Sequence, residues 1–458
     1  MKPSIPKGTR DFLPENARRR AYIFDTIKGF FNTFGFQPIE TPAMENLSTL
    51  TGKYGEEGDR LIFKILNSGD YLNKANAEAL AASDSKKLIP SISEKALRYD
   101  LTVPFARFVV QNQNDITFPF KRYQIQPVWR ADRPQKGRYR EFFQCDADVV
   151  GSDSLWYEVE LMQLFDRVLN ALKLPGFTIK INNRKVLSGL AEIIGQPDKI
   201  IDFTVALDKL DKIGKEKVLQ EMMDKGLSAD ALKLVDPIFS LPDNPSEQLS
   251  IMKNLLKESE VGLKGIAELE FVYDNARAAG LEKAELNFDF TLARGLDYYT
   301  GAIFEVKAHD VEMGSICGGG RYDDLTGVFG QSGLSGVGIS FGADRIYDVL
   351  EALNLFPEFT EGQTQVMLCY FDDENAAANF KLATDLRKAG IATVMYPENA
   401  KLKKQFKYAD ANNIPFVVMG GAEEWKAAKL TVKNMQSGQQ DAVDIDSLVT
   451  YIKEQSIG

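Results

Sequence analysis

The chain is poor in histidine, cysteine and long apolar runs, and each shortage argues against a class of protein. Its 458 residues hold one histidine, His309, and three widely spaced cysteines, Cys145, Cys317 and Cys369. No zinc site or other metal site is expected from so few ligands, and the cysteines predict buried thiols in a reducing compartment. No apolar run reaches the roughly 18 residues of a membrane span. We therefore expect a cytoplasmic protein with no membrane partner.

Common nucleotide-binding and nucleophile motifs are missing as well. The sequence has no GxxxxGK[ST] and no GxGxxG between a strand and a helix, which argues against a P-loop or a dinucleotide-binding fold. A Ser-His-Asp or Cys-His set would have to use His309, and nothing near it resembles a nucleophile. Any nucleotide chemistry must therefore rest on arginines and carboxylates.

The net charge of −10 argues against a protein that coats nucleic acid, but local basic patches can still bind phosphates. There are two such patches. The first lies within eleven residues and holds one acid, Asp132, among Arg130, Arg133, Lys136, Arg138 and Arg140. The second consists of Lys401, Lys403, Lys404 and Lys407. A solvated helix face is an equally good interpretation of the second patch.

Hydrophobic periodicity divides the chain into three domains. Residues 1–181 and 282–355 form the first, 182–281 form a helical insertion, and 363–458 form a small α/β domain with strands spaced for βαβ units. Within the first domain the patterns predict helices over 17–34 and 155–172. They predict strands over 99–103, 123–130, 142–150, 286–290, 298–306 and 335–341, the last leading into a helix near Ala343.

The densest signal runs from Trp129 to Asp148. Interpreted as strand, loop and strand, its alternation places the side chains of Arg138, Arg140, Phe142, Gln144, Asp146 and Asp148 on one face. The opposite face, Phe143 to Val149 in steps of two, is apolar and suits a core. Two carboxylates beside a core need partners. An exposed sheet face with salt bridges is the alternative interpretation.

Three further motifs follow in order. They are Leu292-Ala-Arg-Gly-Leu-Asp-Tyr-Tyr-Thr-Gly301, Cys317-Gly-Gly-Gly-Arg-Tyr-Asp323 and Gly336-Val-Gly-Ile-Ser-Phe-Gly-Ala-Asp-Arg345. Their glycines let the backbone approach a flat ligand closely. Arg345 falls in the first turn of the helix that follows.

Together these motifs closely resemble the histidyl-tRNA synthetases, a family of class II aminoacyl-tRNA synthetases. Residues 36–42, 130–148 and 336–345 resemble class II motifs 1, 2 and 3, and the other two motifs resemble the family's own signatures. The resemblance covers nearly the whole chain, although Asp100 stands where the common bacterial form has glutamate. It implies an α+β catalytic domain with an antiparallel sheet, a helical insertion and a C-terminal α/β anticodon-binding domain.

The resemblance also assigns roles for ATP-dependent activation of L-histidine and its transfer to the 3′ end of tRNA(His). Arg130 and Arg294 would be catalytic at the α-phosphate, Arg345 would hold the γ-phosphate, Phe142 would stack on adenine, and Arg138 and Asp132 would border the nucleotide. Mg²⁺ would accompany ATP without a dedicated protein site. Motif 1 forms the subunit interface in this class, which implies a homodimer.

Histidine and tRNA contacts are implied in the same way. The α-amino group would meet Asp100, Thr102 and Gln144, and the imidazole would meet Asp148 and Tyr299, with Tyr298 and Tyr322 lining the pocket. Core packing is the alternative role for Tyr298. Arg133, Gln135 and Lys136 would meet the tRNA acceptor end, and the lysines at 401, 403, 404 and 407 would contact tRNA from the C-terminal domain.

Two rival assignments share parts of this pattern. One is the regulatory subunit of ATP phosphoribosyltransferase, which has the same catalytic fold but typically lacks the C-terminal domain and the catalytic arginine. The other is a class II synthetase for threonine, proline or glycine. Arg294, the tyrosine pair Tyr298-Tyr299 and the C-terminal domain argue against the first rival, and the motif around Arg294 argues against the second.

Overall fold

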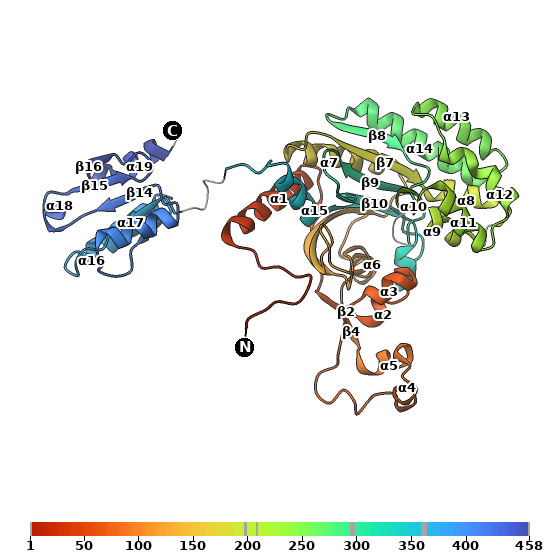
Figure 1. The fold of residues 1–458 in the computed structure, drawn as a ribbon, viewed down its shortest axis with the longest axis horizontal. Helices are drawn as coiled ribbons and strands as arrows, with labels where there is room; N and C mark the ends of the chain where they lie inside the picture. Colours follow the sequence, from red (N-terminus) through yellow and green to blue (C-terminus); the bar gives the residue numbers. More distant parts are fainter. Residues whose placement is uncertain (1, 197–198, 208, 294–297, 359–363, 457–458) are drawn as a thin grey trace. The chain divides into compact units, whose positions relative to one another are not determined.

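The computed structural model describes residues 2–196, 199–207, 209–293, 298–358 and 364–456. The chain forms two compact units, Met1–Phe356 and Pro357–Gly458 (Figure 1). Each unit has its own sheet and its own hydrophobic core. None of the helices in the described ranges has the length and apolar character needed to cross a membrane.

The first unit is built on an eight-stranded sheet with the order β1-β5-β6-β11-β10-β9-β7-β8. Neighbouring strands are antiparallel except for the parallel pairs β1–β5 and β7–β8 at the two edges. The strands are β1 Gln37–Pro38, β5 Phe120–Trp129, β6 Glu141–Val150, β7 Phe177–Asn183, β8 Ala284–Phe288, β9 Ala302–Ala308, β10 Cys317–Tyr322 and β11 Gly336–Gly342.

Three helices pack against one side of this sheet: α1 Pro14–Thr33, α7 Trp156–Ala171 and α15 Ala343–Ala352 (Figure 1). The apolar side chains Cys145, Ala147 and Val149 of β6 belong to the core beneath them and are at most 1% exposed. The predicted alternation is therefore confirmed along β6, because the apolar set faces the core. The polar side chains of β6, which alternate with the apolar ones, therefore lie on the other side of the sheet.

The region between β7 and β8 is helical, as its periodicity predicts, and it lies within the first compact unit. Its elements are α8 Arg184–Ile193, α9 Ile200–Leu207, α10 Leu210–Ile213, α11 Lys215–Asp224, α12 Ala229–Val235, η2 Asp236–Phe239, α13 Pro245–Leu255 and α14 Glu260–Ala279. Gly195, Gly226 and Gly280 end three of these helices with φ of 73°, 93° and 84°. That left-handed conformation is the one in which glycine closes a helix at least cost.

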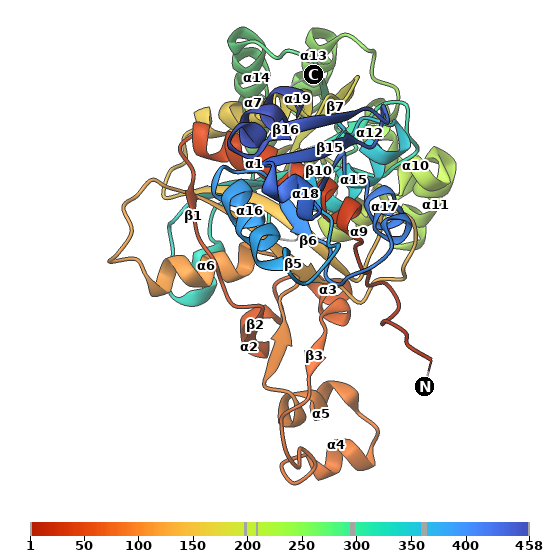
Figure 2. The same cartoon turned by 90° about the vertical axis from the view of Figure 1, so that its left-hand side faces the viewer.

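A smaller sheet joins an arm to the first unit. It has the order β2-β4-β3, with β2 Met44–Asn46, β3 Lys64–Ile65 and β4 Lys95–Leu97. The short helices α2 Leu47–Leu50 and α3 Gly55–Leu61 lie between its first two strands along the chain, and α4 Ala77–Ala81 and α5 Ser85–Ile92 between the last two. Both views show α4 and α5 at the end of an arm that projects from the body of the unit (Figures 1 and 2).

The predicted strand over 99–103 is wrong. Tyr99 and Asp100 are irregular, and helix α6 begins at Thr102 and runs to Gln111. The Val103 N–H donates to Asp100 Oδ1 (3.2 Å), and Pro104 stands in the first turn, where its missing N–H costs nothing. These are helix-start signals that the apparent alternation concealed.

Two other strand boundaries also differ from the prediction. β9 begins only at Ala302, so Tyr298 and Tyr299 precede it and are not constrained to opposite faces. β6 begins at Glu141, so Arg138 and Arg140 belong to the loop before it, where Gln135 and Arg138 pair across a tight turn. Strand alternation therefore applies from Phe142 onward.

The second unit holds a mixed five-stranded sheet with the order β13-β12-β14-β15-β16. The first three strands are parallel and separated by helices, as predicted, whereas β15 and β16 add an antiparallel hairpin that the spacing did not indicate. Its elements are β12 Val366–Leu368, α16 Ala376–Lys388, β13 Thr393–Met395, α17 Leu402–Ala411, β14 Phe416–Met419, α18 Ala422–Lys426, β15 Lys429–Asn434, β16 Gln440–Asp444, η4 Ile445–Ser447 and α19 Leu448–Ser456.

Candidate active site

A polar ladder crosses the middle of the eight-stranded sheet. The strand register aligns Arg122 of β5 with Asp148 of β6 and Gly338 of β11, and places Gln124, Asp146 and Ser340 in the next row. A third row consists of Gln126, Gln144 and Gly342. Side chains two residues apart share a face, so these rows form one polar surface opposite the packed helices.

A small cavity of about 30 Å³ opens on this surface. It is lined by Asp100, Thr102, Gln144, Asp146, Asp148, Tyr298, Tyr299, Tyr322, Gly338, Ile339 and Ser340. All seven residues that the sequence associated with histidine are among them, although Asp100 and Thr102 reach it from the start of α6. Three carboxylates and three tyrosines give this cavity an excess of hydrogen-bond acceptors with orientable hydroxyl donors.

Asp100 is held by three hydrogen bonds. Its Oδ1 accepts from Tyr54 Oη (2.7 Å) and from the Val103 N–H, and its Oδ2 accepts from Tyr298 Oη (3.0 Å). Burial raises the pKa of Asp100, and these donors act against that rise. Tyr54 was not among the predicted site residues, because no local pattern connects it with Asp100, 46 residues away.

Asp148 is also held by side-chain partners, but it lies on strand β6 and one of its partners, Arg122, is charged. Its Oδ1 accepts from Tyr322 Oη at 2.7 Å, and its Oδ2 lies 2.7 Å from the Arg122 guanidinium. The side chains of Arg122 and Asp148 are 0% and 3% exposed. Arg122 was also missed, although Arg122, Gln124 and Gln126 alternate along β5 and signal a polar face.

Gly338 makes room for this carboxylate. A Cβ atom at position 338 would lie 2.0 Å from Asp148 Oδ1, which no real side chain tolerates. At position 336 a Cβ atom would meet the Tyr322 ring at 2.3 Å. Gly336 and Gly338 are therefore explained by the bulk of the tyrosine and the acid that line the cavity.

Burial dominates the electrostatics of the cavity. It raises the pKa of Asp146 to about 7, and it raises the pKa of Asp148 against the opposing charge of Arg122. Burial also raises the pKa of Tyr54, Tyr298, Tyr299 and Tyr322, with the nearby carboxylates adding to the effect. The tyrosines are therefore hydrogen-bond donors at neutral pH rather than phenolates.

Beside the cavity, Arg130 lies at the end of β5. Its guanidinium is 4.3 Å from the centre of the Tyr99 ring and 5.2 Å from the centre of the Phe142 ring, and its Nε donates to the Tyr99 carbonyl (3.1 Å). Aromatic faces hold a planar cation without neutralising its charge. Arg130 therefore carries an available positive charge near the acids of the pocket.

The loop that joins β5 to β6 contacts the start of α15. Arg345 donates through Nε to the Gly137 carbonyl (2.8 Å) and through Nη1 to the Ser315 carbonyl (2.5 Å). Arg138 pairs loosely with Asp132, at 3.6 Å. Arg138 and Asp132 therefore lie in the β5–β6 loop, Arg345 lies against it, and Phe142 follows in β6. Arg294 lies outside the described residues.

The residues assigned to tRNA lie at exposed positions. Arg133, Gln135 and Lys136 occupy the β5–β6 loop. Lys401, Lys403, Lys404 and Lys407 lie at the start of α17 and within it, and Lys404 pairs with Glu398 at 2.5 Å. A group of three or more His, Cys, Asp or Glu side chains suited to a metal ion does not occur in the described part of the chain.

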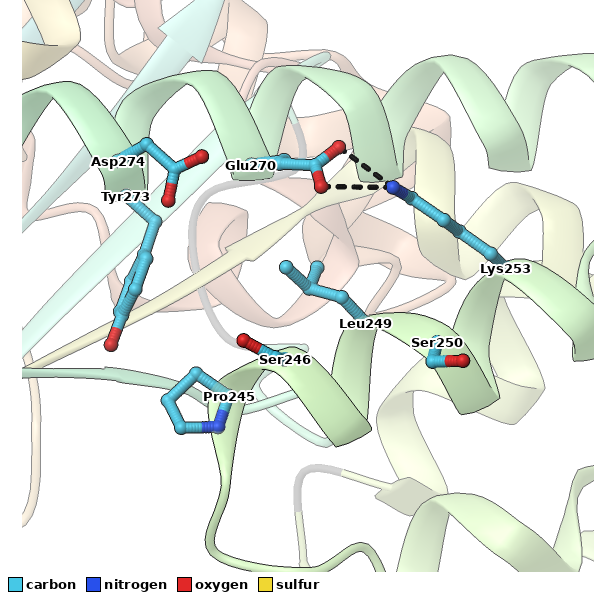
Figure 3. A pocket seen from close by; sticks show the side chains of 8 residues that line it. All are labelled: Pro245, Ser246, Leu249, Ser250, Lys253, Glu270, Tyr273 and Asp274. Carbon is cyan, nitrogen blue, oxygen red and sulfur yellow. Dashed lines mark hydrogen bonds and ion pairs between the residues drawn. The ribbon is translucent and has the colours of Figure 1, made fainter.

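A second and larger cavity, of about 320 Å³, lies between α13 and α14 in the insertion. Figure 3 shows that Lys253 and Glu270 face each other across it. Both Glu270 oxygens pair with Lys253 Nζ, at 2.9 and 2.8 Å, which compensates the charge of each partner. The charges of this pair are therefore balanced within the cavity.

Comparison with known proteins agrees with this geometry. The family described as histidyl-tRNA synthetase matches residues 8–74 and 70–346, and the anticodon-binding domain matches residues 365–455. A histidine–tRNA ligase of Christiangramia forsetii is 62% identical over 454 residues, 99% of this chain and 100% of that protein. One of Phocaeicola vulgatus is 57% identical over 452 residues, 99% of each.

Solved structures agree as well. The crystal structure of histidyl-tRNA synthetase from Nostoc sp. PCC 7120 has a TM-score of 0.80 and 33% identity, covering 99% of this chain and 100% of that one. A large, mostly antiparallel sheet with an anticodon-binding unit defines a class II aminoacyl-tRNA synthetase. The chain belongs to the histidyl-tRNA synthetase family. Its activity is the ATP-dependent ligation of histidine to tRNA.

Proposed function

We propose that the cavity below β6 and β11 is the histidine subsite and that the β5–β6 hairpin with the start of α15 binds ATP. The observation that carries this proposal is that one cavity brings together all seven residues assigned to histidine by resemblance. Asp100, Thr102 and Gln144 would take the α-ammonium group. Asp148 and Tyr299 would take the two imidazole nitrogens, and a site that bonds both nitrogens rejects apolar analogues strongly.

In the activation step the histidine carboxylate attacks the α-phosphate of ATP, so two anions must approach each other. Arg130 would lie between them, since it carries a stacked, available charge beside the cavity. Arg294 would stabilise the α-phosphate from another side, an assignment that rests on the family motif alone. Arg345 would exchange its carbonyl partners for the γ-phosphate, while Phe142 would stack on adenine, bordered by Arg138 and Asp132.

Mg²⁺ would accompany ATP through the phosphates rather than through a protein cage. Asp323 accepts from the hydroxyls of Ser335 and Thr300, each at 2.7 Å, and Asp324 accepts from the Gly333 N–H. Both carboxylates are therefore engaged in local structure and do not fit a metal site. No step of the proposed reaction depends on a protein-bound metal.

The remaining assignments concern partners and organisation. The helical region 182–281 would act as an inserted domain, and the unit that includes residues 363–458 would hold tRNA(His) through the lysines of α17. Residues 133–136 would meet the acceptor end. We further propose a homodimer, because residues 36–42 match class II motif 1, and a cytoplasmic location. Light scattering tests the dimer, and an active monomer of 51.1 kDa would contradict it.

The test of the catalytic assignment is ATP–pyrophosphate exchange with each amino acid in turn. Exchange should require histidine. No exchange with any amino acid would favour a regulatory paralogue, and exchange with threonine, proline or glycine would favour another class II enzyme.

Removing residues 357–458 tests the role of the second unit, which has its own core. Adenylate formation needs only the first unit, whereas charging needs tRNA to be held in register. The truncated protein should keep pyrophosphate exchange and lose most of its aminoacylation efficiency. Charging near the level of the full chain would contradict the anticodon-binding role.

A further inference from the structure

The histidine pocket contains one carboxylate to which the family resemblance gives no role. Asp146 lies between Gln144 and Asp148 on β6, is 2% exposed and lines the cavity. Its Oδ1 is 3.4 Å from Gln144 Nε2, at the limit of a hydrogen bond. Asp148, by contrast, has a guanidinium at 2.7 Å. Asp146 and Asp148 share one face of β6, but Asp148 contacts a guanidinium whereas Asp146 contacts a neutral amide.

Charged and titratable groups face Asp146 from each element around it. They are Asp148 on the same strand, Arg122 on β5, Asp100 before α6, Arg98 after β4, and Tyr299 before β9. Arg98 is engaged by the carbonyls of Thr41 and Pro127, at 2.7 and 2.8 Å. Among the described residues, three carboxylates and no cation line the cavity itself. Neighbouring buried acids cannot all ionise without help, so one of them holds a proton.

The surroundings select Asp146 as the acid that holds this proton. Burial raises its pKa to about 7; Arg122 and the Ser340 hydroxyl lower it, whereas Asp148 and Asp100 raise it. At Asp148 the guanidinium is in direct contact and favours the charged form. At pH 7 about half of the ligand-free molecules therefore carry a protonated Asp146, and the other half carry the carboxylate.

We propose that Asp146 is a further histidine-recognition residue, which gives up its proton when the cationic α-ammonium group of histidine enters the cavity. The inference rests on the proposed histidine subsite. The O–H bond of the Asp146 carboxyl breaks, its electron pair stays on the carboxylate, and the proton passes to solvent. The carboxylate then faces the substrate ammonium in the gap between Gln144 and Asp148. Protons and histidine therefore compete, and histidine binds more weakly as the pH falls.

This arrangement makes a prediction about ligand class. Histidinol keeps the ammonium group and the imidazole, whereas imidazole-4-propionate lacks the ammonium group. Histidinol should therefore expel the proton on binding, and imidazole-4-propionate should not. A carboxylate with only a structural role would make no such distinction.

The titration of Asp146 also makes the stability of the folded state depend on pH. The folded pKa of Asp146 lies above its unfolded value of 3.8, so the folded chain binds an extra proton between those two values. Stability therefore falls as the pH rises through this window. Asp146→Asn cannot ionise, so it should melt at a higher temperature than the wild type at pH 8 while binding histidine less well.

The decisive experiment is calorimetric titration of the full-length enzyme with histidinol in two buffers of different ionisation enthalpy. At pH 7 the wild type should release about half a proton more than Asp146→Asn, because a group with a pKa of about 7 is half protonated there. Its dissociation constant for histidinol should rise about tenfold from pH 8 to pH 6 relative to Asp146→Asn. The imidazole of the ligand titrates equally in both proteins and cancels from this ratio. Glu285→Gln, the same change at an exposed site on the edge strand β8, should behave as the wild type.

The inference fails if the wild type and Asp146→Asn release the same number of protons, or if imidazole-4-propionate expels as many as histidinol. If Asp146→Asn does not fold, Ser340→Ala decides. Loss of the hydroxyl that lowers the pKa of Asp146 should move the pH profile to higher pH, and an unmoved profile would overturn the proposal. Absence of any histidine-dependent exchange by the wild type would instead contradict the histidine subsite.

Discussion

The proposed histidine pocket and the proposed nucleotide side share one sheet, but their polar groups are held in opposite ways. In the pocket, side chains bind one another: Asp148 pairs with Arg122, and Asp100 accepts from two tyrosines. On the nucleotide side, arginines bind backbone carbonyls or stack on rings. Arg345 contacts Gly137 and Ser315 through their carbonyls.

This difference corresponds to two kinds of recognition. A buried acceptor with fixed partners has a defined direction, so it discriminates between ligands by whether they satisfy it. An arginine held by neutral carbonyls keeps its charge and can exchange them for phosphate oxygens, which suits a flexible, highly charged ligand. The cavity holds about 30 Å³, room for about two water molecules, so the proposed binding of histidine there would require some of the lining side chains to move.

The largest expected effect follows from breaking the buried pair. Arg122→Ala removes the partner of Asp148 in a site where both side chains are at most 3% exposed. Leaving one member of such a pair unpaired typically costs about 3–5 kcal/mol. The free energy of unfolding, measured in urea, should fall by about that amount, and histidine-dependent exchange should be lost with it.

A matched control for this change is Arg107→Ala. That arginine also pairs with a carboxylate, Glu45, at 2.7 Å, but its side chain is 23% exposed, so water can replace part of the interaction. Its loss should cost less than that of Arg122. Equal losses would mean that burial does not control the strength of the pocket pair.

On the nucleotide side the effect should fall more on rate than on stability. Arg130→Ala removes a charge that would act on the developing transition state, and such changes typically cost about 10²–10³ in rate. The free energy of unfolding should fall by about 1–3 kcal/mol, because the side chain gives up one hydrogen bond and two ring contacts. Single-turnover formation of histidyl-adenylate measures the first quantity and a urea melt the second. A loss below about fivefold, which is only about 1 kcal/mol, would exclude the assigned role.

Asp148→Asn should affect both stability and histidine recognition, because Asp148 belongs to the buried ion pair and is also the proposed acceptor for imidazole. The change keeps one acceptor oxygen but removes the charge opposite Arg122. It also replaces the second oxygen with an NH2 group, which cannot accept a hydrogen bond from the imidazole. A loss of about 1–3 kcal/mol in histidine recognition raises the KM for histidine about ten- to hundredfold. The KM for ATP should stay within about twofold while the melting temperature falls. An unchanged KM for histidine would leave Asp148 as a structural counter-ion alone.

Much of the fold could be predicted from local patterns. Alternation along 142–150 identified the buried and the polar face of β6, and Gly195, Gly226 and Gly280 marked helix ends. These features depend on short-range periodicity and backbone conformation, which a sequence records directly. The residues of the cavity were assembled by resemblance rather than by periodicity, because they come from segments far apart along the chain.

The errors arose where tertiary contacts override local pattern. The segment 99–103 alternates like a strand, but a carboxylate of Asp100 that caps the next turn makes it the start of a helix. Arg122 was overlooked because its partner lies across the sheet, and Tyr54 because its ring reaches Asp100 from another element. The alternation of Arg122, Gln124 and Gln126 marks a polar face of β5, but no local pattern identifies the partner across the sheet.

The smallest effect is expected for Arg138, an exposed residue on the proposed nucleotide side. Arg138 is 46% exposed and lies 3.6 Å from Asp132, so it is neither buried nor tightly paired. Exposed pairs of this type contribute about 0–1 kcal/mol and weaken with salt. Arg138→Ala should therefore leave the urea melt unchanged and raise the KM for ATP by no more than about fivefold at low salt, with the difference shrinking as salt is added. A salt-independent rise of more than about fiftyfold would mean that Arg138 meets ATP in a desolvated site. The nucleotide side would then share the fixed recognition of the histidine pocket, and the contrast between the two ends of the site would be lost.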